Sequence, residues 1–351
     1  MIHGGDIYTE GIFKGRKLLD YSSNINPLGL PQSFVHNIDE ALKNAEVYPD
    51  INYRNVIKSI KEYIGLNNAG IVLGNGASEI IELSISLFKT ILIVVPSYVE
   101  YELDAKRYGI KTKFSYLSES MEINYEDIFS KLKEVDALII GNPNNPNGGI
   151  IDKNKFRDIL DFCEENGKKV IIDEAFIEFT ANVDFSFVNE CEKYSCIFII
   201  RAMTKFFSMP GVRLGYGITA NEDMINKIKS KQNPWNVNCF AEMAAVHCLK
   251  DEKYIKESLL WIREEREFLT NELKKMDFIK QVFWTMGNFV LCKLKGINEN
   301  ELYDYCLRHR IVIRKASNFR GLDESFIRLA IKDRTSNRRL LSTFYNMENE
   351  L

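Results

Sequence analysis

The sequence predicts an α/β protein with a large domain built on a mostly parallel sheet and a second, small α+β domain. Its 351 residues exceed the roughly 250 to 300 residues at which single hydrophobic cores stop growing. Short apolar runs alternate with helical stretches through the middle of the chain, and the pattern changes after about residue 252. Length, alternation and the change of pattern together predict this fold class.

Short apolar runs bounded by turn residues predict strands that are buried on both faces of the sheet. They are GIVLG at 70–74, ILIVV at 91–95, ALIIG at 137–141, KVIID at 169–173 and CIFIIR at 196–201. Helical patterns cover 77–88, 153–167 and 221–231. Such alternation predicts parallel strands joined by right-handed crossovers.

The two ends of the chain are expected to form the small domain together. A long helical stretch from about 252 precedes the apolar runs FVLCKL (289–294), IVIRKA (311–316) and FIRLAI (326–331), and then a last helix. The first 40 or so residues show no strong periodicity and are predicted to wrap back onto this part. The expected boundaries are an N-terminal segment at 1–44 that joins the small domain, a large cofactor-binding domain at 45–251 and a small C-terminal domain at 252–351.

Composition favours a small-molecule partner over nucleic acid or a membrane. The net charge of -3 arises from 46 basic and 49 acidic residues that are mixed along the chain. We find no apolar stretch of about 18 residues that could span a bilayer and, at the start MIHGGDIYTE, no secretory pattern. Seven cysteines without a CxxC pair predict reduced core residues. We therefore expect a cytoplasmic protein without a metal site.

Polar residues follow separate apolar runs, at the strand ends where ligands of open α/β sheets bind. Asp173 closes KVIID, Tyr98 lies in PSYVEY (96–101), Asn145 lies in GNPNNPNGG (141–149) and Lys205 lies in RAMTKFFSMPGVRLGY (201–216). Taken singly, each is as readily explained by a loop charge, a turn, packing or a solvated surface group. Their order along successive strands predicts one site.

These side chains suit pyridoxal 5'-phosphate (PLP). PLP requires a lysine for a Schiff base, a carboxylate at the ring nitrogen, anchors for the phosphate and a flat group against the ring. Lys205 is predicted to form the Schiff base and Asp173 to keep the ring nitrogen protonated. Tyr98 is predicted to stack on the ring, and Asn145 to donate a hydrogen bond to its O3' oxygen.

The segment GNGASE (74–79) joins a strand to a helix and is predicted to hold the cofactor phosphate. Gly76, Ala77 and Ser78 would place backbone N–H groups at an anion, and Arg213 would bind the same phosphate. The segment lacks the GxGxxG and GxxxxGK[ST] patterns, so it supports neither dinucleotide nor P-loop binding.

These motifs resemble the class I/II aminotransferase superfamily over nearly the whole chain, and within it most closely the L-threonine-O-3-phosphate decarboxylases of cobalamin biosynthesis. The likeness rests on HGGD (3–6), DYSSNINPLG (20–29), YPD (48–50), GNG (74–76), DEAF (173–176), TKFFSMPGVRLGY (204–216), NPWNVN (233–238), IREE (262–265) and IRKASNFRGLD (313–323). The resemblance implies the aspartate-aminotransferase-like PLP fold (fold type I). It also implies decarboxylation of L-threonine O-3-phosphate to (R)-1-amino-2-propanol O-2-phosphate.

The resemblance also assigns residues to the substrate. Asn24 and Arg328 would hold its carboxylate, and His3 and Arg314 its phosphate. Arg314 and Arg328 lie in apolar strand patterns, where an unpaired charge is costly. Tyr48 would reach the cofactor phosphate of a neighbouring subunit, which implies a homodimer.

Histidinol-phosphate aminotransferases are similar too, but they usually carry a tyrosine where Phe176 stands and an NENP-like turn where this chain has NINP. Three further positions depart from the family pattern. Ala202 replaces a hydroxyl residue that touches the cofactor phosphate, for which Thr204 would compensate in part. Asn147 replaces a threonine, and Asp6 replaces an asparagine.

Three alternatives stay open at this point. One is an aminotransferase that acts on histidinol phosphate or another amino acid, and another is a decarboxylase of L-serine O-phosphate. The third is a non-catalytic binding or regulatory protein with the same fold, against which the presence of Lys205 and Asp173 argues.

Overall fold

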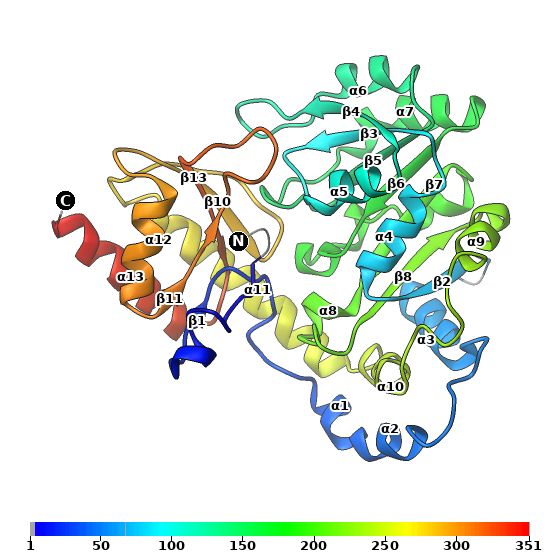
Figure 1. The fold of residues 1–351 in the computed structure, drawn as a ribbon, viewed down its shortest axis with the longest axis horizontal. Helices are drawn as coiled ribbons and strands as arrows, with labels where there is room; N and C mark the ends of the chain where they lie inside the picture. Colours follow the sequence, from blue (N-terminus) through cyan, green and yellow to red (C-terminus); the bar gives the residue numbers. More distant parts are fainter. Residues whose placement is uncertain (1–3, 67, 351) are drawn as a thin grey trace.

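The computed structural model describes residues 4–66 and 68–350, which form two α/β parts side by side (Figure 1). The larger part is built on a seven-stranded sheet with the order β2-β8-β7-β6-β5-β3-β4. Its strands are β2 (Gly70–Asn75), β3 (Thr90–Val95), β4 (Lys111–Tyr116), β5 (Ala137–Gly141), β6 (Lys169–Asp173), β7 (Ile197–Ala202) and β8 (Leu214–Thr219). Only β8 runs antiparallel to its neighbours β2 and β7. The predicted mostly parallel sheet is confirmed.

All five strands predicted for this sheet are present, and two further strands belong to it. β4 has the sequence KTKFSY and lies at the edge, where all of its residues except Ser115 are partly or fully exposed. An edge strand of this kind carries no apolar run to reveal it. β8 has the sequence LGYGIT, and its glycines weaken the strand pattern. Gly217 is required there, because an added Cβ would lie 2.3 Å from the ring of Phe198.

Helices cover both faces of this sheet (Figure 1). Successive residues of one strand pack on opposite faces: Ile139 belongs to the apolar cluster of Ile80, whereas Leu138 belongs to the cluster of Phe156. The helices of this part are α3 (Arg54–Ile64), α4 (Ala77–Ile85), α5 (Glu100–Arg107), α6 (Tyr125–Leu132), α7 (Lys153–Glu165), α8 (Met203–Phe206), α9 (Glu222–Lys229) and α10 (Cys239–Cys248), with the 3-10 turns η2 (Ile177–Thr180), η3 (Val183–Phe185) and η4 (Val188–Glu192).

The smaller part contains an antiparallel sheet with the order β12-β13-β10-β9. Its strands are β9 (Ile279–Val282), β10 (Phe289–Leu294), β12 (Arg314–Lys315) and β13 (Phe326–Ala330), and its helices are α11 (Glu252–Leu273), α12 (Glu299–Arg308) and α13 (Arg334–Glu350). The beginning of the chain, which includes the short turn η1 (Ile12–Lys14), contacts this part through β1. β1 (Leu19–Asp20) pairs in parallel with β11 (Ile311–Val312).

The second part of the segment predicted at 1–44 packs on the larger part of the molecule instead. α1 (Gln32–His36) and α2 (Ile38–Asn44) lie against α10 (Figure 1). The exact domain boundaries therefore stay a prediction.

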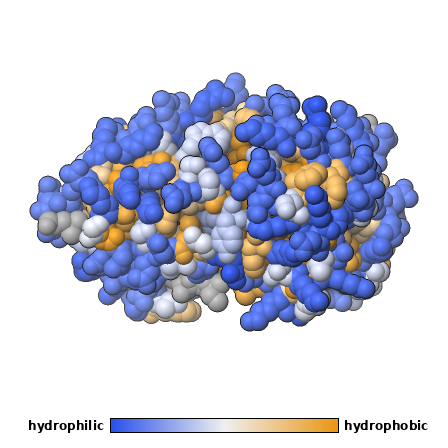
Figure 2. Space-filling view, turned by 90° about the horizontal axis from the view of Figure 1, so that it is seen from above, coloured by the Kyte–Doolittle hydropathy of each residue, from blue (hydrophilic) through white to orange (hydrophobic). Residues whose placement is uncertain are grey.

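Polar side chains cover most of the face drawn in Figure 2, with smaller apolar areas between them. Among the described residues, no helix combines the length and the apolar character needed to cross a membrane.

Candidate active site

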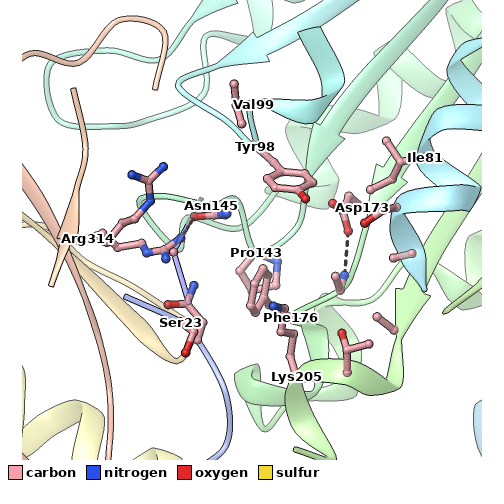
Figure 3. A pocket seen from close by; sticks show the side chains of 18 of the residues that line it. Ser23, Ile81, Tyr98, Val99, Pro143, Asn145, Asp173, Phe176, Lys205 and Arg314 are labelled. Carbon is pink, nitrogen blue, oxygen red and sulfur yellow. Dashed lines mark hydrogen bonds between the residues drawn. The ribbon is translucent and has the colours of Figure 1, made fainter. Parts of the chain in front are cut away.

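A cavity of about 240 Å³ lies where the two parts meet, at the carboxyl ends of β3, β5, β6 and β7. Arg314 and Asn145 lie on one side of it and Asp173 on the other, with Tyr98, Pro143 and Phe176 between them (Figure 3). Most of the predicted site residues line it: Asn24, Ala77, Ser78, Tyr98, Asn145, Asp173, Phe176, Thr204, Lys205, Arg213, Arg314 and Arg328. Residues more than 300 positions apart in the sequence thus share one cavity.

Asp173 ends β6 and is buried, with 8% of its surface exposed. The Tyr101 hydroxyl donates to one carboxylate oxygen at 2.5 Å, and the Ala175 backbone N–H donates to the other at 3.0 Å. Both donors are neutral, and burial raises the pKa of the Asp173 carboxyl. A cation that enters the cavity beside Asp173 would offset the free-energy cost of burying the ionised carboxylate.

Lys205 lies on the single turn α8, which begins directly after β7. Burial, together with the positive charges of Arg328, Arg213 and Lys332, lowers the pKa of its amino group to about 8, although Asp173 acts in the opposite direction. A lysine with this pKa is partly neutral near physiological pH, and the neutral amine is the form that attacks a carbonyl.

Tyr98 follows β3, and its ring meets that of Tyr101 edge to face, with centroids 5.7 Å apart. Its hydroxyl interacts with the side chain of Ser78, and burial raises its pKa to about 12. Tyr101 is buried and holds Asp173. The two tyrosines therefore tie the start of α4 to the carboxylate at the end of β6.

An anion cradle forms where β2 turns into α4. Gly76 precedes the first turn of α4 with φ +84, and a Cβ on it would lie 2.1 Å from the Arg213 guanidinium. Gly215 on β8 is equally restricted, since its Cβ would lie 2.2 Å from the backbone nitrogen of Ala77. The two glycines let the N–H groups of α4 and the Arg213 cation approach the same point.

Arg328 is buried on β13 and donates to the Asn145 side-chain oxygen and to the Ser22 carbonyl, each at 2.6 Å. Because arginine only donates hydrogen bonds, this contact fixes the amide orientation of Asn145 and leaves its nitrogen as the outward donor. The Arg328 Nε and the Asn24 side-chain oxygen are buried without a hydrogen-bond partner among the described residues. Both residues line the cavity, so a ligand there lies next to these buried polar groups.

Arg314 lies on β12, beside Arg328 on β13, with which it is in register. It is 4% exposed, and burial lowers its pKa. Its guanidinium donates to the Lys315 carbonyl at 2.6 Å and to the Asn318 side-chain oxygen at 2.7 Å, and it stacks over the ring of Phe319. The loop after β12 therefore holds this cation at the cavity wall.

The cavity carries more positive than negative charge. Lys205, Arg213, Arg314 and Arg328 line it, whereas Asp173 is the single carboxylate among the described residues that line it. Burial lowers the pKa of both Arg314 and Arg328, the latter to about 9. Such a set fits anionic ligands, since an anion offsets the cost of burying positive charge. The donor set, the two-glycine cradle and the isolated Asp173 fit a cofactor that has a phosphate and a basic ring nitrogen.

Several predicted residues lie elsewhere. Tyr48 is 78% exposed and stacks on Trp235 at 4.6 Å, away from the cavity. His3 lies outside the described residues. Asn147 is buried within its loop, where it accepts from Asn144 and donates to the Met121 carbonyl. Asp6 accepts from the Tyr8 and Thr9 backbones and so stabilises a turn.

Sequence reasoning missed Tyr101 and Asn318, although a signal for one of them exists. Tyr101 stands three residues after Tyr98, in the first turn of α5, so it follows the same strand end closely in the sequence. Asn318 accepts from Arg314 only four residues away, whereas the Ser22 carbonyl holds Arg328 from the opposite end of the chain, and no local spacing reveals this second contact.

Comparison with known proteins places this site in a family. The family model described as aminotransferase class I and II matches residues 16–344. The chain belongs to this family. Its cofactor is pyridoxal 5'-phosphate, as the sequence predicts, and the fold is that of the aspartate-aminotransferase-like PLP enzymes.

Individual relatives carry two different names. A "Putative threonine-phosphate decarboxylase" of Caldanaerobacter subterraneus subsp. tengcongensis is 39% identical over 99% of this chain and 94% of its own length. The threonine-phosphate decarboxylase of Salmonella typhimurium is 30% identical over 98% of this chain and 96% of its own length. A crystal structure titled histidinol-phosphate aminotransferase, from Clostridium acetobutylicum, is 62% identical and covers 95% of this chain and 100% of its own, with a TM-score of 0.94. The protein is thus a PLP-dependent enzyme with two candidate reactions.

Proposed function

We propose that the enzyme decarboxylates L-threonine O-3-phosphate to (R)-1-amino-2-propanol O-2-phosphate, in cobalamin biosynthesis. The observation that carries this proposal is the presence of three arginines, Arg213, Arg314 and Arg328, in one cavity of about 240 Å³. The cofactor phosphate, the substrate carboxylate and the substrate phosphate are three anions, and each would meet one of these cations.

In this assignment, Arg213 and the first turn of α4, at Gly76, Ala77 and Ser78, hold the cofactor phosphate. Ala202 stands where the family has a hydroxyl residue that touches this phosphate. Thr204 also lines the cavity, and its hydroxyl would supply a donor to the phosphate in place of the missing one. Asp173 keeps the ring nitrogen protonated, the Asn145 amide donates to O3', and Tyr98 packs on the ring.

Arg328 and Asn24 would bind the substrate carboxylate. The orphaned Arg328 Nε supplies a donor that has no partner among the described residues, and a carboxylate offers acceptors of matching geometry. Arg314 would bind the substrate phosphate, with His3 as a second donor. The name of the relatives at 39% and 30% identity agrees with this choice of substrate.

When bound, PLP accepts the electron pair that is released at the substrate Cα. The bond that breaks is the one perpendicular to the ring plane, so the residues that orient the substrate choose the reaction. Arg328 and Asn24 would hold the carboxylate in that direction, and Arg314 would fix the far end of the molecule. Binding energy at the remote phosphate then contributes to orientation.

Lys205 has two roles in the proposal. It would hold the cofactor, and after the substrate amine has displaced it, Lys205 would take up a proton from solvent and, as an ammonium group, supply the proton that takes the place of CO2 on Cα. A pKa of about 8 suits both roles, because the amine gains and loses a proton near neutral pH.

A histidinol-phosphate aminotransferase is the second candidate, and the 62% identity to the structure of that title favours it. Histidinol phosphate carries a phosphate and an amine but no carboxylate, so Arg328 would serve the second substrate of the transfer. Phe176 argues for the decarboxylase, because its ring lines the cavity without a hydroxyl for O3'.

The test is to incubate the holoenzyme with L-threonine O-3-phosphate alone, and in parallel with L-serine O-phosphate. Decarboxylation needs no 2-oxo acid, so CO2 release should continue for many turnovers, faster with the threonine derivative. Absence of CO2 together with a single burst of pyridoxamine phosphate would instead support the aminotransferase. Histidinol phosphate with 2-oxoglutarate, as a matched reaction, measures that activity directly.

We also propose a homodimer in which Tyr48 reaches the cofactor phosphate of the partner subunit. Tyr48 is too exposed to be part of its own cavity, and exposed apolar side chains gather in the same stretch of the chain. They are Leu28, Leu30, Val35, Ile38, Leu42, Val47 and Ile51. Apolar surface of this kind is typical of a protein interface.

The cytoplasm is the proposed compartment. The seven cysteines are unpaired and all but Cys239 are buried, as in proteins of reducing compartments.

A further inference from the structure

A second cavity of about 460 Å³ is lined by Phe206 of α8, the residue that follows Lys205 in the chain. Its walls are mostly apolar and come from α3, η2, α8 and α11; they include Tyr63, Ile64, Ile177, Phe206, Ile255 and Leu259. One polar end is formed by Glu178, Arg201 and Ser186. Its volume is that of a small-molecule site.

Glu178 is the unusual group in this cavity. Its side chain is 8% exposed, and its Oε2 has no hydrogen-bond partner among the described residues. Its Oε1 lies 3.9 Å from the Arg201 NH1. A buried carboxylate oxygen without a donor is costly and rare.

The nearby charges do not balance Glu178. Arg201 donates to Glu174 through Nε at 3.1 Å and NH2 at 3.0 Å, and Glu174 also accepts from Ser186 and the Phe187 N–H. One cation therefore faces two buried carboxylates, Glu174 and Glu178. The other titratable groups that act on Glu178 are the phenols of Tyr63 and Tyr216, which supply no positive charge.

We propose that this cavity binds an apolar organic cation with an N–H donor, whose charge pairs with Glu178 and whose body fills the apolar walls. The ligand would restore the charge balance of the Arg201 cluster and satisfy Oε2. The same cation is disfavoured in the active-site cavity, which Arg213, Arg314 and Arg328 line. The two cavities thus select ligands of opposite charge.

Protonation of Glu178 should be coupled to binding. Burial is the largest influence on this carboxyl and raises its pKa to about 7, although Arg201 opposes the effect. Because the ionised form binds the cation, affinity should increase as the pH rises through about 7, and binding at neutral pH should release protons.

N,N-dimethylbenzylamine is a suitable probe, because a protonated tertiary amine carries one N–H and cannot form a Schiff base with PLP. Titration calorimetry on the holoenzyme should show one site per chain. Glu178→Gln should weaken binding by at least about tenfold and abolish proton release. Benzyltrimethylammonium, which has the charge without the N–H, should bind the wild type less tightly.

Leu259→Trp provides a second route, since it fills the cavity without altering the Arg201–Glu174 pair. Leu260→Trp, on an exposed neighbour that does not line the cavity, is its control. The proposal is supported if Leu259→Trp loses probe binding and Leu260→Trp keeps it. The proposal is overturned if the probe does not bind the wild type, or if Glu178→Gln or Leu259→Trp binds it as tightly. Equal affinity for both probes would overturn the assigned hydrogen bond to Oε2.

Discussion

Lys205 is held among charges that oppose its own protonation. Burial and the cations Arg328, Arg213 and Lys332 favour the neutral amine, and its pKa falls to about 8. The neutral amine is the nucleophile, so we expect the rate of PLP uptake by the cofactor-free enzyme to rise with pH and level off above about 8. Stopped-flow absorbance measures this profile. A midpoint near the ordinary lysine value of about 10.4 would contradict it.

The anchoring role of Lys205 has a separate check. Borohydride reduction of the holoenzyme followed by peptide mapping should find the cofactor on Lys205, and an adduct on any other lysine would refute the assignment.

Phe176 lines the cavity and meets Phe289 edge to face at 5.0 Å. Phe176→Tyr would add a donor to the O3' oxygen, which already accepts the proton of the Schiff base. Competition for this oxygen should lower the pKa of the Schiff base nitrogen by about 1, the equivalent of one hydrogen bond. Absorbance titration of the holoenzyme measures it. Phe319→Tyr, which adds a hydroxyl beside Arg314 instead, should leave this pKa unchanged.

Substitution of Arg314 tests which anion each arginine binds. If Arg314 binds the substrate phosphate, Arg314→Ala removes a charge-assisted contact worth about 1.5 to 3 kcal/mol and raises KM roughly 10- to 150-fold. PLP affinity should change little, because Arg213 holds the other phosphate. Arg338→Ala removes an exposed cation of α13 and is the matched control. Equal losses of substrate and cofactor affinity would assign Arg314 to the wrong anion.

At the scale of elements, the cofactor cradle depends on how closely β8 approaches the start of α4. A Cβ at Gly215 would lie 2.2 Å from the Ala77 nitrogen and 2.5 Å from the Gly76 carbonyl carbon. We therefore expect Gly215→Ala to displace the first turn of α4, with a loss of roughly 1 to 3 kcal/mol in the free energy of unfolding and weaker PLP binding.

Gly211→Ala is the matched control for this change. Gly211 lies in the loop before β8 and has no neighbour within 4 Å of an added Cβ. Thermal unfolding and PLP titration of both variants separate the two cases. Equal behaviour would mean that the contact between β8 and α4 does not form the cradle.

At the scale of the whole molecule, contacts between the two parts define the cavity. Arg320, in the loop after β12, donates to Glu102 on α5 at 2.8 Å and stacks over Phe114 on β4. Arg328 reaches Asn145 across the same boundary. The position of the small part therefore determines whether the proposed carboxylate site faces the cofactor site.

We expect the enzyme to be a dimer in solution, with Tyr48 of each subunit serving the partner's cofactor. Light scattering should give twice the mass of one chain. Tyr48→Ala should weaken PLP binding without changing this mass, whereas Tyr345→Ala, a change at another partly exposed tyrosine, should do neither. A stable and fully active monomer would remove this part of the model.

Local sequence was sufficient for five of the seven strands of the large sheet and for its ligand-binding edge. Buried strands read as continuous apolar runs, and the polar residue after each run lies at the edge where ligands bind. Asp173, Asn145, Tyr98 and Lys205 could be found in this way, because each lies within a few residues of a strand end. The family motifs added the arginines, since Arg314 and Arg328 stand in short strands with no loop signal.

Only the tertiary structure decided what these residues contact. The Arg328 bond to Asn145, the Tyr101 bond to Asp173 and the approach of Gly215 to Ala77 join segments that are distant in the sequence. The edge strand β4 and the glycine-containing β8 gave weak patterns, because strand propensity depends on packing against neighbours. The excess of negative charge at Glu178 likewise could not be predicted from the sequence, because the charge around a buried carboxylate depends on which side chains the fold brings together there.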